Sequence, residues 1–134
     1  MSAFKVSVSS KFEELWRYNI VLVCEVCNTN GERLDYLAEE STVAPVGSNL
    51  EAAPIDYSVD RTLRIATKEG DHLNILVYVI PHTLPSTNDI IKTKPFPLIV
   101  KVENTEKEVL VNQAFKINQW SGDNIALKKV GANR

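Results

Sequence analysis

The stretch that decides the fold class reads Ile20-Val21-Leu22-Val23-Cys24-Glu25-Val26-Cys27, and Asn28-Thr29-Asn30-Gly31 follows it at once. Apolar side chains at every second position are typical of a β-strand. Val21 and Val23 make the other face apolar at first, so we expect a central strand that is partly covered on both sides. Asn30-Gly31 supplies the positive φ angles of a tight turn, so the chain is expected to turn back along residues 32–38.

The same period of two residues recurs along the rest of the chain, most strongly in the apolar run from His72 to Ile80. The expected strands cover about residues 4–9, 18–27, 32–38, 61–67, 72–80, 96–103, 108–119 and 124–130. Leu34, Leu37 and Ala38 also fit a helical spacing. For residues 32–38 we prefer a strand because the Asn-Gly turn precedes it.

Eight short strands in a chain of 134 residues predict an all-β fold, a single-domain antiparallel two-sheet β-sandwich over residues 1–134. The alternative is a barrel. Long connections at 39–60 and 81–95 favour the sandwich, because they suit Greek-key or jelly-roll-like crossovers. Ser10 and Glu13 have the spacing of a capping box, so a short helix near residues 11–17 is an open possibility.

Composition narrows the functional classes. Hydrophobic residues make up 44% of the chain, enough for a real core, and 15 basic residues against 17 acidic ones give a net charge of -2. This near-balance of charges excludes the strongly basic composition of many nucleic-acid-binding proteins and also excludes an acidic disordered tail. We therefore expect no nucleic-acid partner.

The N-terminus shows no signal peptide, and the longest uncharged apolar stretches are far shorter than the roughly 18 residues of a membrane span. We expect a soluble cytoplasmic protein without a membrane span. Export that is independent of a signal peptide would leave the same sequence pattern.

Cys24 and Cys27 match a C-x-x-C pattern, but residues three apart in a strand point to opposite faces. We therefore expect two free thiols and no redox centre. A second cysteine pair that would complete four zinc ligands is absent from the sequence, and no Asp-x-Asp pair suggests calcium. We expect no metal and no cofactor.

His72 and His82 lie at the two ends of one predicted strand, about 33 Å apart at roughly 3.3 Å per residue, so they cannot share one site. Asp71 and His72 are expected to face opposite ways, as strand neighbours do. Either histidine alone could still serve a small ligand-binding or enzymatic site.

Two long loops remain as candidate binding surfaces, because function on this architecture is usually carried by loops. The candidate partner-binding residues are Val43, Val46, Leu50, Ile55, His82, Leu84, Ile90 and Ile91. The alternative is that these loops fold over the ends of the sandwich and close its core.

The sequence therefore predicts a non-enzymatic interaction module that binds another protein through loops or a sheet edge. A self-assembling structural subunit of a homo-oligomer is one alternative. A small ligand-binding or enzymatic sandwich with a site near His82 or His72 is the other.

Overall fold

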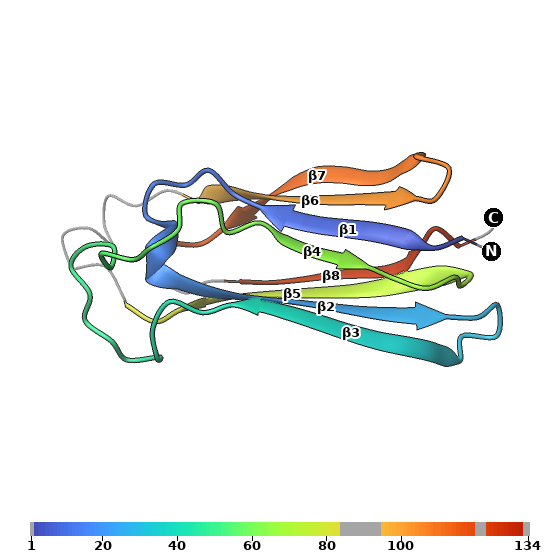
Figure 1. The fold of residues 1–134 in the computed structure, drawn as a ribbon, viewed down its shortest axis with the longest axis horizontal. Coiled ribbons are helices and arrows are strands. Elements are labelled where there is room, and N and C mark those ends of the chain that lie inside the picture. Colours follow the sequence, from blue (N-terminus) through green and yellow to red (C-terminus); the bar gives the residue numbers. More distant parts are fainter. Residues whose placement is uncertain (1, 84–94, 120–122, 133–134) are drawn as a thin grey trace.

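The computed structural model describes residues 2–83, 95–119 and 123–132, which form eight strands and one short 3-10 turn. The strands are β1 (Phe4–Ser9), β2 (Tyr18–Cys27), β3 (Arg33–Ser41), β4 (Leu63–Ala66), β5 (His72–Pro81), β6 (Phe96–Asn104), β7 (Val109–Ile117) and β8 (Asp123–Val130). They pair antiparallel into two sheets with the orders β4-β1-β6-β7 and β3-β2-β5-β8. The sheets stack on each other (Figure 1), which confirms the predicted all-β, two-sheet sandwich.

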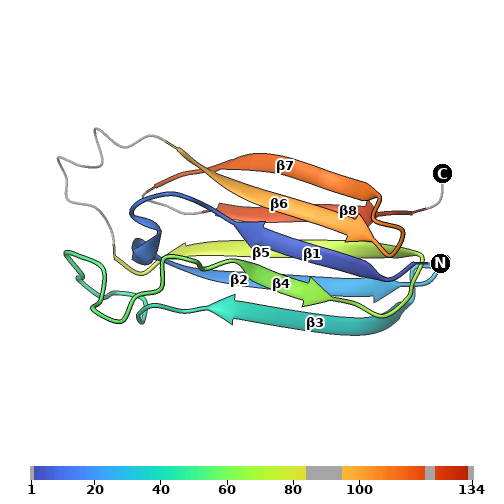
Figure 2. The same cartoon turned by 45° about the horizontal axis from the view of Figure 1, so that its top comes forward.

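Two strand pairs, β2–β3 and β6–β7, are hairpins within a sheet, and the other consecutive strands lie in different sheets. The chain leaves β1, β3, β5 and β7 at one end of the sandwich, here called the loop end. Strand β1 begins and strand β8 ends at the opposite end, here called the hairpin end (Figures 1 and 2). The two long connections that the sequence singles out therefore start from the same end.

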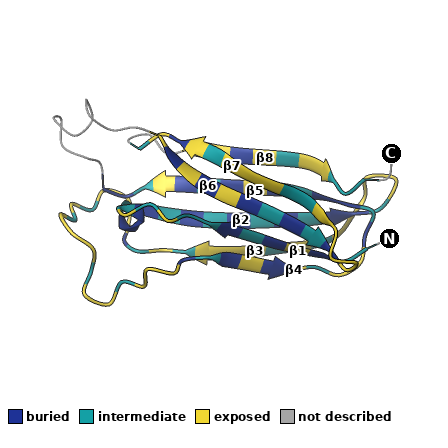
Figure 3. Ribbon diagram, turned by 90° about the horizontal axis from the view of Figure 1, so that it is seen from above, coloured by how far each residue is buried: buried dark blue, intermediate teal, exposed yellow. Residues whose placement is uncertain are grey.

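The core lies between the inner faces of the two sheets. Along β6, buried and more exposed residues alternate (Figure 3), as the period-two pattern predicts. Leu22, Val77 and Val100 are fully buried. The strand expected at residues 32–38 is β3, so the helical alternative for this segment is wrong.

The short helix considered near residues 11–17 reduces to the 3-10 turn η1 (Leu15–Arg17). The Ser10 hydroxyl accepts a hydrogen bond from the Phe12 amide at 3.2 Å and donates one to the Pro97 carbonyl at 2.7 Å. The hydroxyl therefore ties this connection to β6 instead of capping a helix. Strand β2 begins directly after η1, so no length remains for further turns.

Residues 10–17 close the core at the loop end. The Phe12 ring stacks on Phe96 with 4.4 Å between ring centroids, and Tyr18 packs against the same ring at 5.1 Å. Leu15 and Trp16 of η1 are buried. The loop end is therefore sealed by side chains from residues 12–18 and Phe96, which leaves the connection 42–62 outside the core cluster.

Candidate functional site

The connection 42–62 carries the most exposed apolar side chains among the described residues. The relative exposures of Val46, Ile55 and Val59 are 71%, 108% and 84%. Val43 and Leu50 are half-buried, and the neighbouring Ala44 is buried. Of the predicted binding residues, Val46 and Ile55 thus lie open at the loop end, whereas Leu84, Ile90 and Ile91 lie outside the described residues.

The base of this connection is held in place by hydrogen bonds from other elements. The Asn19 side chain on β2 accepts a hydrogen bond from the Val43 amide at 2.8 Å and donates one to the Ala44 carbonyl at 2.7 Å. Gly47, at φ 94°, donates its N–H to the His82 carbonyl at 3.1 Å. The exposed apolar residues therefore stand on an anchored loop.

His82 is 2% exposed and lies beneath this loop. Its Nε2 is 2.6 Å from the Trp16 carbonyl oxygen, so Nε2 carries a proton and donates it. Its Nδ1 is 2.7 Å from the Thr83 hydroxyl. Burial lowers the pKa of His82 below 6.5; the hydrogen bond to Trp16 opposes this, and the nearby Arg61 and Arg17 charges add to it. This imidazole links the chain just after β5 to the η1 turn.

Arg61 is a buried cation at the loop end that the sequence analysis missed. Only 8% of its surface is exposed. Its Nε donates to the Ser41 hydroxyl at 2.8 Å, one Nη to the Leu15 carbonyl at 2.7 Å, and the other Nη to the Ser41 carbonyl at 2.7 Å. None of the described carboxylates forms an ion pair with it, and burial lowers its pKa.

Through these hydrogen bonds, the Arg61 guanidinium links the end of β3 to η1. Arg61 itself lies just before the start of β4. It also lines two hollows at the loop end, of about 220 and 570 Å³, and Tyr57 lines both of them too. The arginine lies 5.7 Å from the centre of the Tyr57 ring. In the sequence this arginine sits in a polar segment and looks like a solvated residue, so no local signal could have found it.

His72 lies at the hairpin end, where the structure corrects one expectation. Its Nδ1 is 2.8 Å from the Asp71 carboxylate, although the two were expected to face opposite ways. Asp71 precedes the first residue of β5, so the strand alternation does not apply to it. Cys27 lies opposite His72 in the register. Burial and the Glu25 carboxylate raise the pKa of the Cys27 thiol, the reverse of what a nucleophilic cysteine needs.

Both cysteines are free and buried, as predicted. Cys24 belongs to the core cluster, whereas the Cys27 sulfur lies 3.5 Å from Glu25 on the outer side of β2. In the described part of the chain, no group of three or more histidine, cysteine or acidic side chains could hold a metal ion. Whether the purified protein carries a metal stays a prediction for elemental analysis.

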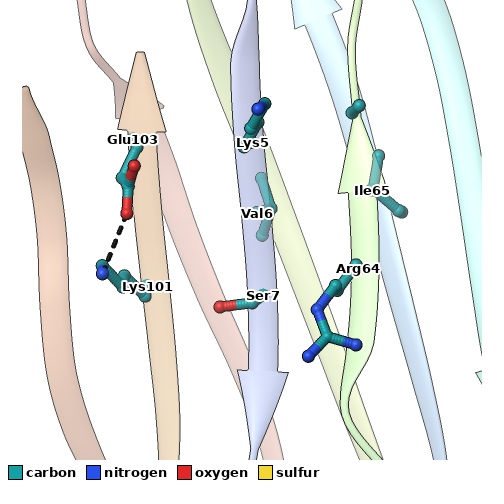
Figure 4. A pocket seen from close by; sticks show the side chains of 8 residues that line it. Lys5, Val6, Ser7, Arg64, Ile65, Lys101 and Glu103 are labelled. Carbon is teal, nitrogen blue, oxygen red and sulfur yellow. Dashed lines mark ion pairs between the residues drawn. The ribbon is translucent and has the colours of Figure 1, made fainter. Parts of the chain in front are cut away.

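The outer face of the sheet β4-β1-β6-β7 is polar and contains a hollow of about 430 Å³. Ser7 on β1 lies between Arg64 of β4 and Lys101 of β6 in the register, and its short side chain leaves the space (Figure 4). Lys101 is paired with Glu103 at 2.8 Å. Lys5, Arg64 and Lys101 against the single carboxylate of Glu103 give the lining of the hollow a net positive charge.

The outer face of the sheet β3-β2-β5-β8 is different, because its centre is apolar. We call it the apolar face; its members are Val21, Val23, Ala38, Leu76, Tyr78, Ile80 and Ala126. Leu76 and Ile80 are 38% and 37% exposed. Val21 and Val23 are half-buried, which agrees with the expected central strand. The apolar residues on the outer face of β2 therefore lie at the surface of the molecule.

Comparison of the chain with protein-family models, with curated proteins and with solved structures finds no match. In the parts of the chain that the structure describes, no helix is long and apolar enough to cross a membrane.

Proposed function

We propose that this chain is a non-enzymatic β-sandwich that binds another protein through its loop end. The observation that carries the proposal is the set of open apolar side chains Val46, Ile55 and Val59 on one anchored connection. Apolar side chains that are left in water and are not needed to close a core suit a contact with a partner.

The anchoring of the loop also supports binding. The hydrogen bonds from Asn19 and the bond from Gly47 to His82 hold the base of the connection before any partner arrives. A loop that is already ordered loses less conformational entropy on association, which favours affinity. The exposed apolar residues therefore stand on a connection whose base is hydrogen-bonded to β2 and to the chain just after β5, an arrangement that suits a binding loop.

The chemistry of the buried groups argues against an enzyme. His82 donates to a carbonyl and is shielded from solvent. The pKa of the Cys27 thiol is raised, so little thiolate is present near neutral pH. A small-molecule site near His82 or His72 thus gains no support, because both imidazoles are buried and hydrogen-bonded.

The experiment places a photo-crosslinking amino acid at Ile55 in the full chain and captures contacts in cells of the native host. We expect one protein to be crosslinked at Ile55 and also at Val59. The matched control carries the same crosslinker at Val109, a strand residue 50% exposed at the hairpin end, where no crosslink to that protein is expected. Equal crosslinking at Val109 and Ile55, or none at Ile55, contradicts the proposal.

A second candidate is favoured by a different observation. The apolar face lies away from the 42–62 connection, on the outer side of the sheet β3-β2-β5-β8, and it suits the self-assembling subunit that the sequence left as an alternative.

A further inference from the structure

One face of the sandwich is basic, although the chain as a whole is not. On the outer face of the sheet β4-β1-β6-β7, whose strand residues all lie in the described part of the chain, the basic residues are Lys5, Arg64, Lys101 and Lys116, and the one acidic residue is Glu103. The whole chain has a net charge of -2. Positive charge is therefore gathered on this face, and three of the four cations line the hollow of about 430 Å³.

The protection of sheet edges does not explain where these cations lie. Lysines on an edge strand hinder the pairing of a sheet with another chain. Lys5 and Lys101, however, lie on β1 and β6, which are the two central strands of this sheet. Both strands already pair with a neighbour on each side, so these two lysines have no edge to protect.

Ser7 lies at the centre of the hollow. In the register it is opposite Arg64 of β4 on one side and opposite Lys101 of β6 on the other. With neighbouring strands about 4.8 Å apart, the backbones of Arg64 and Lys101 are roughly 10 Å apart. Figure 4 shows the Arg64 side chain extending towards β1 and the Ser7 hydroxyl pointing towards β6. A small group over Ser7 is therefore within reach of a guanidinium, a hydroxyl and an ammonium group.

Two carboxylates sense these cations without neutralising the hollow. Glu103 pairs with Lys101 at 2.8 Å, and the hydrogen bond and the charge of Lys101 lower the pKa of Glu103. Asp60 lies outside the lining, and its pKa is lowered mainly by two hydrogen bonds from Thr62, with a smaller contribution from the charge of Arg64. In the described part of the chain, no carboxylate forms an ion pair with the other two cations of the lining. Three cations against one carboxylate leave an excess of two positive charges.

We propose that this hollow binds a phosphate group, either free phosphate or that of a small phosphate monoester, over Ser7 and between Arg64 and Lys101. A phosphate monoester carries a charge of about -1.5 to -2 at neutral pH, which matches the excess positive charge of the lining. The guanidinium can donate two parallel hydrogen bonds to phosphate oxygens, and the lysine ammonium groups act as point charges.

The size and the residues of the site favour a small ligand over nucleic acid. The volume of about 430 Å³ falls in the range of about 300–1,000 Å³ that is typical of small-molecule sites, so it leaves room for an organic group beside the phosphate. None of the outward-facing residues on the described strands of this face is aromatic, so unpaired bases find no ring on which to stack.

Nuclear magnetic resonance titration of the isotope-labelled full chain tests the proposal, with glycerol phosphate and inorganic phosphate as probes at a constant ionic strength of about 0.1 M. We expect saturable shifts of the Ser7, Arg64 and Lys101 amides, with a Kd in the millimolar range because the contacts are solvated. Acetate, with a single charge, is expected to bind about tenfold more weakly. Tighter binding of glycerol phosphate assigns the site to an organic phosphate, and equal binding assigns it to free phosphate.

Two variants with the same change in net charge separate a site from a generally basic face. Arg64→Gln removes a cation of the lining and is expected to weaken the binding of glycerol phosphate roughly threefold to tenfold. Lys116→Gln is the matched control, because Lys116 lies on β7 of the same face but does not line the hollow. Its Kd is expected to equal that of the wild type.

Glu103→Gln is expected to change the affinity in the opposite direction. The side chains of Lys101 and Glu103 are 44% and 31% exposed, so their ion pair is solvated and a ligand can compete with it. Removing the carboxylate frees Lys101 and raises the positive charge of the lining, so phosphate is expected to bind about threefold more tightly. Ser7→Leu fills the hollow from its centre and is expected to abolish the saturable shifts.

Four outcomes overturn the proposal: no saturable shift in the wild type, acetate binding as tightly as glycerol phosphate, equal weakening by Arg64→Gln and Lys116→Gln, or weaker binding by Glu103→Gln. Equal weakening would indicate an extended polyanion on the whole face. Thermal melting checks that each variant is folded, and if Ser7→Leu is not, the charge variants decide. The site uses no residue of the 42–62 connection, so this proposal and the loop-end proposal can fail separately.

Discussion

The Nε2 atom of His82 lies 2.6 Å from the carbonyl oxygen of Trp16, so one buried imidazole joins the chain just after β5 to the η1 turn. The backbone reinforces this link, because the His82 amide donates to the Arg17 carbonyl at 3.0 Å and the His82 carbonyl accepts from Gly47. Three connections at the loop end therefore meet at a single residue. The protonation state of that imidazole therefore affects the stability of the loop end, which carries the surface proposed for binding.

Acidification is expected to weaken the fold through His82. Burial lowers its pKa in the folded state below the ordinary value of 6.5. Above pH 6.5 both the folded and the unfolded chain hold a neutral imidazole, so the contribution to the free energy of unfolding is complete. As the pH falls below 6.5, the unfolded chain takes up a proton that the folded chain resists, and the free energy of unfolding decreases.

Thermal melting between about pH 7.5 and pH 5.5, around the ordinary histidine pKa, measures this effect. His82→Gln keeps a side chain that can donate to the Trp16 carbonyl but cannot titrate. We expect the melting temperature of the variant to change less over this range than that of the wild type. Equal slopes for the two proteins would show that His82 does not titrate as its burial requires.

Replacing Arg61 with leucine is expected to destabilise the fold by roughly 2–4 kcal/mol, because three charge-assisted hydrogen bonds to Ser41 and Leu15 are lost and the Leu15 acceptor stays buried. Urea unfolding measures the change. Arg61→Lys is the matched variant: it keeps the charge but cannot reproduce the planar fork, so it is expected to recover only part of the loss. A change below about 0.5 kcal/mol in Arg61→Leu would mean that the guanidinium does not hold the loop end.

The two thiols are expected to stay reduced and to react slowly in the folded protein. Burial raises the pKa of Cys24 to about 12 and also raises that of Cys27, so both remain protonated at pH 8. Alkylation followed by mass spectrometry is expected to modify neither cysteine quickly in native buffer and both after unfolding in urea. An intramolecular bridge between Cys24 and Cys27 in native protein would contradict their placement on opposite faces of β2.

Adjacent residues on β5 are expected to differ sharply in their tolerance of a charge. Val77 is fully buried in the middle of the strand, so Val77→Asp places an unpaired carboxylate in the core and is expected to abolish soluble folded protein. Val77→Ala is the milder change, with an expected loss of roughly 2 kcal/mol. Leu76→Asp, on the outer face, is expected to fold. Similar melting temperatures for Val77→Asp and the wild type would mean that the inner face is assigned wrongly.

The sequence alone determined the strands and the fold class. Side chains alternate between the two faces of a strand at every residue, so Phe4, Val6 and Val8, or Ile75 and Val77, reveal their shared face without any knowledge of their partners. The segment Asn28–Gly31 likewise turns the chain between β2 and β3: Gly31 has a φ of 82°, and its amide donates to the Asn28 carbonyl at 2.9 Å, whereas Asn30 does not have the positive φ that was expected of it. Both signals are local, which is why they could be read from the chain.

Only the tertiary structure decided which surfaces remain open. Val21 is as apolar as its neighbour Leu22, yet only Leu22 faces the second sheet and is fully buried. Arg61 is buried and hydrogen-bonded because acceptor oxygens of Ser41 and Leu15, which are distant in the sequence, lie around its guanidinium. His82 was predicted to be a partner-binding residue, but its side chain is buried and hydrogen-bonded to the Trp16 carbonyl of η1. Such outcomes depend on which strands pair and which faces meet, and these are contacts between residues far apart in the chain, which no local pattern encodes.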